Sequence, residues 1–165
     1  MILIARLWGV AYARLMDGLA DASLARPWMR GWLVAAGIYN LLWGTAVVVV
    51  PDLPFTMAGI EPMQGTARAI WQCLGMVIGV YGVGYIAASA APTVHWPIVL
   101  VGFLGKIFGP IGFVWTASRG EIPWNFGWTI LTNDLIWWIP FGGILLAAWR
   151  VRAVPPATIR RQARM

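Results

Sequence analysis

The sequence predicts an all-α integral membrane protein, built as a four-helix antiparallel bundle with an additional amphipathic helix at the N-terminus. Of the 165 residues, 60% are hydrophobic and only 11% are charged, and the mean hydropathy is +0.73. A soluble domain carries roughly a quarter charged residues, and a small globule cannot bury this much apolar surface. Four apolar runs appear, at residues 31–50, 70–91, 96–117 and 124–149. Each reaches about 20 residues, enough to cross a hydrocarbon core of about 30 Å.

Residues 1–25 are predicted to form an amphipathic helix that lies in the membrane interface or docks against a partner. At 100° per residue, Arg6, Arg14, Asp17 and Asp21 fall in one stripe of such a helix. A cleaved signal peptide is less consistent with the sequence, because Arg6 and Arg14 interrupt its apolar region. The helix should end before Pro27, since a residue that precedes proline avoids the helical conformation.

The distribution of cations predicts the orientation. If both termini are cytoplasmic, the cytoplasmic side carries nine arginines and the outer loops carry only Arg68 and Arg119. This bias follows the positive-inside rule and points to the inner membrane of a bacterium, with residues 150–165 as a basic cytoplasmic tail. The net charge of +6 is therefore attributed to orientation, and nucleic acid is not expected as a partner. The nine cytoplasmic cations are Arg6, Arg14, Arg26, Arg30, Arg150, Arg152, Arg160, Arg161 and Arg164.

The loops order the spans within a single membrane domain. Residues 51–69, rich in proline and glycine, are predicted to form a cap at the outer surface. The loops at residues 92–95 and 118–123 are short, so the second span should lie beside the third, and the third beside the fourth.

A layer of polar residues is predicted near the middle of the bilayer. Counted along each span at 1.5 Å per residue, Asn40, Tyr81, Lys106 and Asp134 reach similar depths. An unpaired charge there costs about 2.5–3.5 kcal/mol. We therefore expect a Lys106–Asp134 ion pair that faces the bundle interior, with Asn133, Asn40 and Tyr81 as hydrogen-bonding neighbours.

Two prolines support this polar layer. Pro110 cannot donate to the carbonyl of Lys106, and Pro140 cannot donate to that of Ile136, so both carbonyls need other partners. The cluster has two interpretations: a buried pair that fixes helix register, or a ligand or proton site of the kind found beside interrupted transporter helices.

Glycines and tryptophans suggest a groove. Gly75 and Gly79 on the second span, and Gly105 and Gly109 on the third, have the spacing that permits close helix contact. The alternative is a groove for a lipid tail, a quinone or a flat pigment. Trp137 and Trp138, which interfacial positions do not explain, could stack on a ring-shaped ligand.

Few residues suggest intrinsic catalysis. Cys73 and His95 are the only residues of their types and are expected on opposite membrane sides, so no transition-metal or haem site can be built from them. No phosphate-binding loop or dinucleotide fingerprint appears.

Four segments, GIYNLLWG, WQCLGMVIGVYGVGY, HWPIVLVGFLGKIFGPIGF and WTILTNDLIWW, resemble a family of small, uncharacterised four-span bacterial membrane proteins. The resemblance covers roughly residues 37–146 and implies the four-span fold. Some members of that family are labelled alkyl hydroperoxide reductase. That activity requires an activated thiolate, and the neighbours of Cys73, Gln72 and Leu74, supply no activating group.

Three hypotheses for function follow. The first is a non-catalytic membrane subunit that packs against a larger photosynthetic or respiratory complex, with a bound lipid, quinone or pigment as its only candidate cofactor. The second is a small oligomeric transporter or proton-coupled carrier centred on Lys106 and Asp134. The third is a redox or lipid-modifying enzyme that uses Cys73, His95 or Asp134. The expected partners are the bilayer and other membrane subunits or further copies of the chain.

Overall fold

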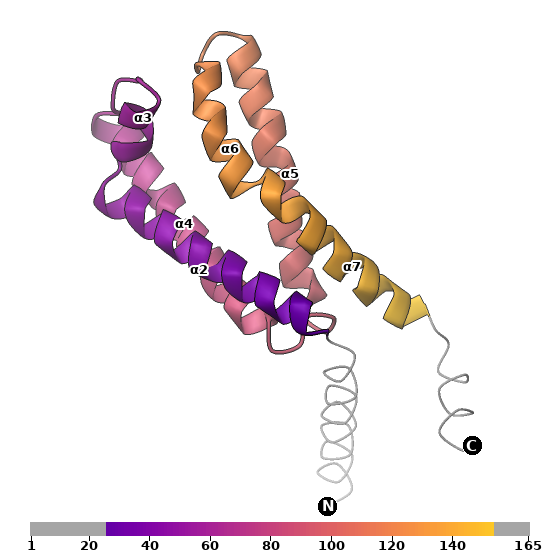
Figure 1. The fold of residues 1–165 in the computed structure, drawn as a ribbon. Coiled ribbons are helices and arrows are strands. Elements are labelled where there is room, and N and C mark those ends of the chain that lie inside the picture. The colour runs from indigo at the N-terminus through magenta and orange to yellow at the C-terminus, as the bar shows by residue number, and fades with distance from the viewer. Residues whose placement is uncertain (1–25, 154–165) are drawn as a thin grey trace, which may run out of the picture.

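The structure is a computed structural model that describes residues 26–153, and all its secondary structure in that range is helical. This confirms the predicted all-α class. The helix predicted for residues 1–25 and the tail beyond residue 153 lie outside the described residues. The elements are α2 (Pro27–Val49), α3 (Leu53–Met57), α4 (Gly65–Ala88), α5 (Trp96–Ser118), η1 (Trp124–Gly127), α6 (Trp128–Asn133), η2 (Leu135–Trp137) and α7 (Trp138–Ala153) (Figure 1).

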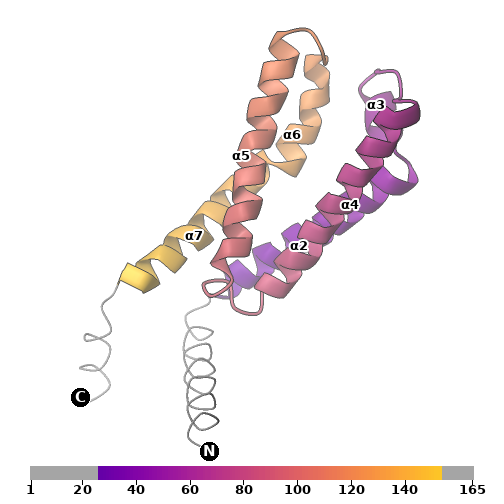
Figure 2. The ribbon, with the colours of Figure 1, turned by 180° about the vertical axis from the view of Figure 1, so that it is seen from behind.

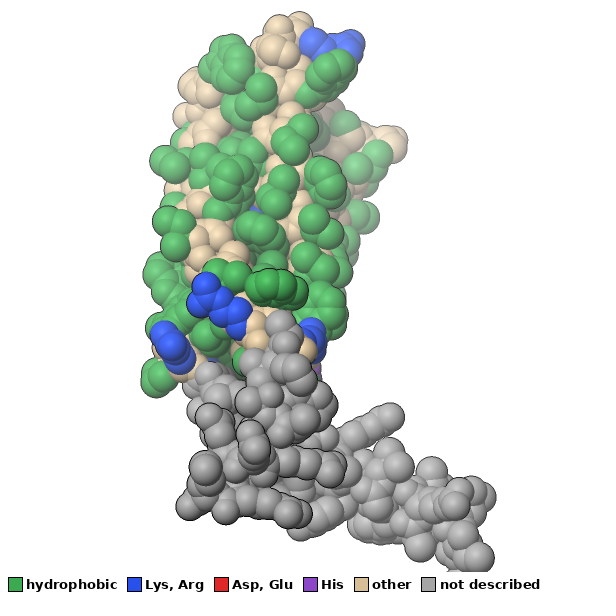
Figure 3. Space-filling view, turned by 90° about the vertical axis from the view of Figure 1, so that its right-hand side faces the viewer, with side chains coloured by type: hydrophobic (Ala, Val, Ile, Leu, Met, Phe, Trp, Pro, Cys, Tyr) green, Lys and Arg blue, Asp and Glu red, His purple; other side chains and the backbone are tan. Residues whose placement is uncertain are grey.

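Four segments are long and apolar enough to cross a membrane: Pro27–Val49, Gly65–Ala88, Trp96–Ser118 and Trp124–Arg152. The last combines η1, α6, η2 and most of α7. Large apolar side chains such as Leu42, Val80 and Ile139 are exposed on these helices, as expected of surfaces that face lipid. Figure 3 shows one such face, where hydrophobic side chains occupy the space between cations at either end. The chain is a multi-pass membrane protein.

Local sequence explains where the first helix begins. α2 starts at Pro27, ahead of the predicted residue 31, because proline fits the first turn of a helix and Arg26 before it is extended. α4 likewise starts earlier than predicted, at Gly65. The short loop after α5 turns at Gly120, whose φ of 74° favours glycine.

The helices form two arms that meet at one end of the molecule. α2 and α4 run side by side in one arm, and α5 and α6 in the other, whereas α7 crosses towards the start of α2 and of α5 (Figures 1 and 2). We call the end that carries Arg26, Arg30, Arg150 and Arg152 the basic end, and the opposite end, which carries α3, the α3 end.

Two hydrophobic clusters join the arms. The larger one, towards the basic end, draws on all four spans and includes Leu33, Tyr85, Val99, Trp137 and Phe141. In the smaller one, at the α3 end, the ring of Phe55 stacks on that of Phe126 at 5.6 Å between centroids.

A hydrogen bond reinforces the smaller cluster. Asn125 Nδ2 donates to the carbonyl of Ala58 at 2.7 Å. The segment between α2 and α4 thus closes the end of its own arm and contacts η1 of the other arm.

Glycines bring α2 and α4 into backbone contact. A Cβ atom built on Gly44 would lie 2.5 Å from the carbonyl oxygen of Gly75, and one on Gly82 would lie 2.7 Å from that of Gly37. Contacts between α4 and α5 are sparser, although a short loop connects them. The predicted neighbours are therefore present, but the closest approach is between the first and second spans.

Candidate functional site

The fourth span is broken at its centre, beside the predicted polar layer. α6 ends at Asn133, and Asp134 leaves the helical conformation with φ −121° and ψ −61°. Neither proline of the third and fourth spans lies at this break. Pro110 lies within α5, which continues to Ser118, and Pro140 lies in the first turn of α7, where a missing N–H is tolerated.

Side chains satisfy the carbonyls that the break exposes. Lys106 Nζ donates to the carbonyl of Asn133 at 2.5 Å, and Trp137 Nε1 donates to that of Thr132 at 3.1 Å. A helix leaves its last four carbonyls without partners, and none can stay unpaired in hydrocarbon without a large cost. The break is thus held by specific donors.

The carbonyl of Lys106, which Pro110 leaves without an N–H donor, also has a hydrogen-bond partner, as predicted. Trp138 Nε1 donates to the carbonyl of Lys106 at 2.9 Å. This bond supplies a structural reason for Trp138, and Trp137 is buried in the larger cluster, with 4% of its surface exposed. The buried ring of Trp137 is not free to stack on a ligand as the sequence suggested, whereas Trp138 is 39% exposed and its Nε1 bond leaves the faces of its ring uncommitted.

The predicted Lys106–Asp134 ion pair is wrong in its geometry. In the part of the chain that the structure describes, ion pairs with N–O distances within 4.0 Å join Arg68 to Asp52 and Arg119 to Glu121, and none joins Lys106 to Asp134. Both side chains are buried, each 5% exposed. The ammonium is compensated by a different arrangement.

The ammonium of Lys106 lies at the C-terminal end of α6, whereas Asp134 precedes the short η2 without a side-chain capping hydrogen bond. Helix C-termini favour cations. The carboxylate of Asp134 lies against α5 at Gly109, where an added Cβ would come within 2.9 Å of Oδ2.

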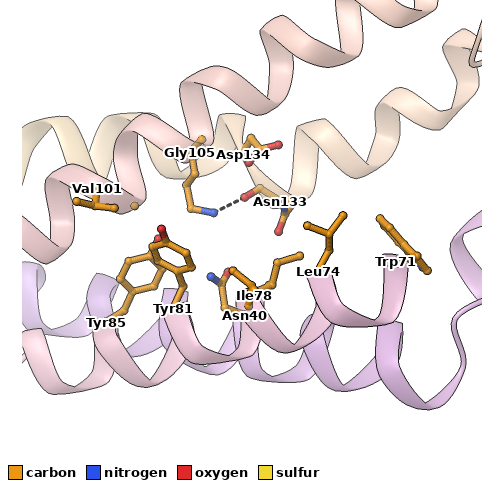
Figure 4. Close-up of a pocket in the computed structure, with 13 residues that line it drawn as sticks. Asn40, Trp71, Leu74, Ile78, Tyr81, Tyr85, Val101, Gly105, Asn133 and Asp134 are labelled. Atoms are coloured by element: carbon orange, nitrogen blue, oxygen red, sulfur yellow. Dashed lines mark hydrogen bonds between the residues drawn. The ribbon is translucent and has the colours of Figure 1, made fainter. Parts of the chain in front are cut away.

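A pocket of about 250 Å³ lies between α4 and the break. It brings together all five residues of the predicted polar cluster: Asn40, Tyr81, Lys106, Asn133 and Asp134. Figure 4 shows side chains of α2 and α4 on one side and those of α5 and α6 on the other, with the Lys106–Asn133 bond drawn as a dashed line.

The pocket opens sideways between α4 and α5. Its apolar wall includes Leu74, Val77 and Val101, which are about half exposed. In a bilayer, this opening faces lipid tails. The larger cluster closes the pocket towards the basic end, and the smaller cluster lies towards the α3 end.

Two buried oxygen atoms of the pocket have no hydrogen-bond partner among the described residues, Asn40 Oδ1 and Asn133 Oδ1. Asn40 is 4% exposed. In Figure 4, the amides of Asn40 and Asn133 point into the space between the two sides. Buried polar atoms normally have partners, and exceptions often mark binding sites or bound water.

The four glycines of the predicted groove have separate surroundings. Gly75 contacts Val47 and Gly44 of α2, and the backbone of Gly79 lies beside Gly44. Their face of α4 therefore serves helix contact. Gly109 accommodates Asp134, and only Gly105 of the four lines the pocket.

Two aromatic residues of the pocket were not among the predicted site residues. Tyr85 follows Tyr81 by one helical turn, a spacing that places both on one face, and its hydroxyl lies over Gly102. Trp71 also lines the pocket and donates to the carbonyl of Pro51 at 3.1 Å. The helical spacing of the tyrosines could have identified Tyr85; no sequence signal distinguished Trp71.

Cys73 and His95 do not approach the pocket. Cys73 is exposed on α4, and His95 precedes α5 at the basic end. Within residues 26–153, no three His, Cys, Asp or Glu side chains gather as a metal site would require. Comparisons with protein-family models, with curated proteins and with solved structures found no match.

Proposed function

We propose that the protein is a non-catalytic integral membrane subunit that holds a lipid-soluble molecule in the pocket between α4 and the broken fourth span. The observation that carries the proposal is the pair of buried, unpartnered amide oxygens in a pocket that is otherwise mainly apolar. Ligand sites in proteins share this composition, with a few polar groups that fix the orientation of a largely apolar molecule. A lipid, a quinone or a pigment has the required character.

A sideways opening favours a role within a larger membrane complex. A molecule that enters between Leu74 and Val101 arrives through the lipid. The protein that supplies or receives this molecule is therefore expected in the same membrane. The separation of Cys73 from His95 supports a holding role over a catalytic one. We propose a photosynthetic or respiratory complex of a bacterial inner membrane as the partner.

The described charges support an orientation with both termini in the cytoplasm. Arg26, Arg30, Arg150 and Arg152 gather at the basic end. At the α3 end, Arg68 and Arg119 are each paired with a carboxylate, at 3.3 Å and 2.6 Å. The positive-inside rule assigns the basic end to the cytoplasm. A fluorescent reporter that folds only in the cytoplasm should therefore fluoresce when it is fused to the C-terminus.

The test of the proposed function is purification of the tagged protein from its native membranes in a mild detergent, followed by mass spectrometry and an absorption spectrum. We expect a stoichiometric complex, together with a lipid-soluble molecule that is lost when Gly105, which lines the pocket, is replaced by leucine. Isolation of a homogeneous monomer or homodimer without such a molecule would overturn the proposal.

Proton-coupled transport is a second candidate, favoured by the broken helix. Half-helix ends beside buried charges form substrate and ion sites in several transporters. In proteoliposomes with an imposed pH gradient, Asp134→Asn should then abolish proton flux while leaving assembly intact. Equal flux in the variant and the original protein would exclude this mechanism.

A further inference from the structure

We propose that the pocket selects a neutral molecule with a hydroxyl group on an aromatic ring and an apolar tail, that is, a phenol or hydroquinone lipid. The inference rests on the proposed function and specifies the chemistry of its ligand. It follows from which hydrogen-bonding groups around the pocket are already paired and which are not.

Two indole donors beside the break are occupied. The indole N–H groups of Trp137 and Trp138 bind carbonyls, and Lys106 uses one of its N–H groups on Asn133. Those bonds hold the backbone in place. The two tyrosine hydroxyls that line the pocket can both donate and accept, so the preference for a ligand donor rests on the buried amide oxygens alone.

The unpartnered atoms of the pocket are acceptors. Asn40 Oδ1 and Asn133 Oδ1 come from different helices, α2 and α6, and the two amides point into the same space. A buried acceptor without a donor loses the full free energy of its hydration. A ligand hydroxyl restores that bond, whereas a ketone or an ether cannot, because it has no hydrogen to donate.

The charges of the pocket favour a neutral ligand. Lys106 and Asp134 both line it, are equally buried and carry opposite charges. Their formal charges sum to zero, so a charged ligand would lose its hydration and leave a net charge at this depth. The headgroup of an anionic phospholipid is therefore disfavoured.

The lining favours a ring with a tail. The aromatic side chains of Trp71, Tyr81 and Tyr85 line the pocket, and aromatic rings pair favourably with one another. The volume of about 250 Å³ far exceeds the roughly 30 Å³ that one water molecule occupies. A tail can leave through the opening beside Val77 and Val101.

The probes are 4-nonylphenol and its methyl ether, 4-nonylanisole. The ether carries a methyl group in place of the hydroxyl hydrogen, so it cannot donate a hydrogen bond. Binding to the delipidated full-length protein in detergent is measured by calorimetry. We expect the phenol to bind about fivefold to tenfold more tightly than the ether, the ratio that one net hydrogen bond supplies.

Three variants locate the effect. Asn40→Leu should remove the preference for the phenol while leaving the affinity for the ether unchanged. Gly105→Leu projects a side chain into the pocket and should abolish binding of both probes, since an added Cβ meets open space there. The matched control is Gly112→Leu, also on α5 and also in open space but outside the pocket.

The outcomes separate this inference from the proposed function. Equal binding of phenol and ether, lost in Gly105→Leu, would retain the pocket as a ligand site and overturn the preference for a hydroxyl. A preference that persists in Asn40→Leu and in Asn133→Leu would overturn the assignment of the acceptors. Absence of binding of either probe, or binding unaffected by Gly105→Leu, would contradict both the inference and the proposed function.

Discussion

The two faces of α4 show how differently two helix interfaces of one small protein can be built. Towards α2, glycines bring the backbones into contact, and a Cβ at Gly44 would collide with Gly75. Towards α5, the side chains separate and leave a pocket with polar residues. The first interface depends on steric fit, whereas the region around the second depends on electrostatic compensation. Substitutions should therefore act on them by different mechanisms.

The largest effect is expected where charge compensation is removed. Lys106→Met leaves the carbonyl of Asn133 without its donor and Asp134 without a nearby cation, and should destabilise the protein by roughly 3–5 kcal/mol. The free energy of unfolding in mixed micelles, titrated with a denaturing detergent, measures this loss. The double variant Lys106→Met/Asp134→Leu should recover only the part that comes from the uncompensated charge, because the carbonyl of Asn133 still lacks its donor. Additive losses would show that the two charges act independently.

A steric substitution at the α2–α4 interface should have the next largest effect. Gly44→Ala introduces a Cβ that would lie 2.5 Å from the backbone oxygen of Gly75, and should cost roughly 1–3 kcal/mol. Thermal unfolding followed by circular dichroism tests it. Gly31→Ala is the matched control on the same helix, since nothing lies within 4 Å of its added Cβ. Similar melting temperatures for the two variants would refute the steric account of this interface.

Loss of a single hydrogen bond should have a smaller effect. Trp138→Phe keeps an aromatic ring but removes the donor to the carbonyl of Lys106, and should cost about 1 kcal/mol. Trp149→Phe, at a residue that is 67% exposed, provides the comparison. Chemical denaturation in the same detergent should separate the two variants. An equal effect would mean that the carbonyl freed by Pro110 does not depend on the indole.

The smallest effect on stability is expected inside the pocket. Gly105→Leu adds a side chain to open space and should change the free energy of unfolding by no more than about 0.5 kcal/mol. Gly112→Leu should behave in the same way. A large destabilisation confined to Gly105→Leu would show that α4 and α5 close on each other more tightly than the pocket suggests.

The polar layer was predictable from the sequence, because counting residues along each helix is enough to place a side chain in depth. Asn40, Tyr81, Lys106 and Asp134 share a depth by counting, and they line one pocket. The need of the Lys106 carbonyl for another hydrogen-bond donor also followed from Pro110 alone. The identity of that partner, Trp138, did not, because the indole arrives from another helix.

The position of the break was less predictable. Pro140 directed attention to Ile136, but α6 ends at Asn133, where the ammonium of Lys106 binds the exposed carbonyl. This contact joins residues that are distant in sequence, so local helix propensity does not predict it. Close helix contact at Gly75 and Gly79 was predicted, but its partner α2 was not, since Gly37 and Gly44 reveal their role only when paired with Gly82 and Gly75.

The break has a consequence for biosynthesis. A segment that carries Asn133 and Asp134 at its centre enters the bilayer poorly on its own, because insertion of a carboxylate costs about 2.5–3.5 kcal/mol. The preceding span, α5, carries Lys106 and is joined to it by the short loop at residues 119–123. The two are therefore expected to leave the translocon as one hairpin, in which the cation of the earlier helix stabilises the later one. The last two spans would then insert as a single unit. The first two spans, whose glycines bring their backbones into contact, would form a second unit.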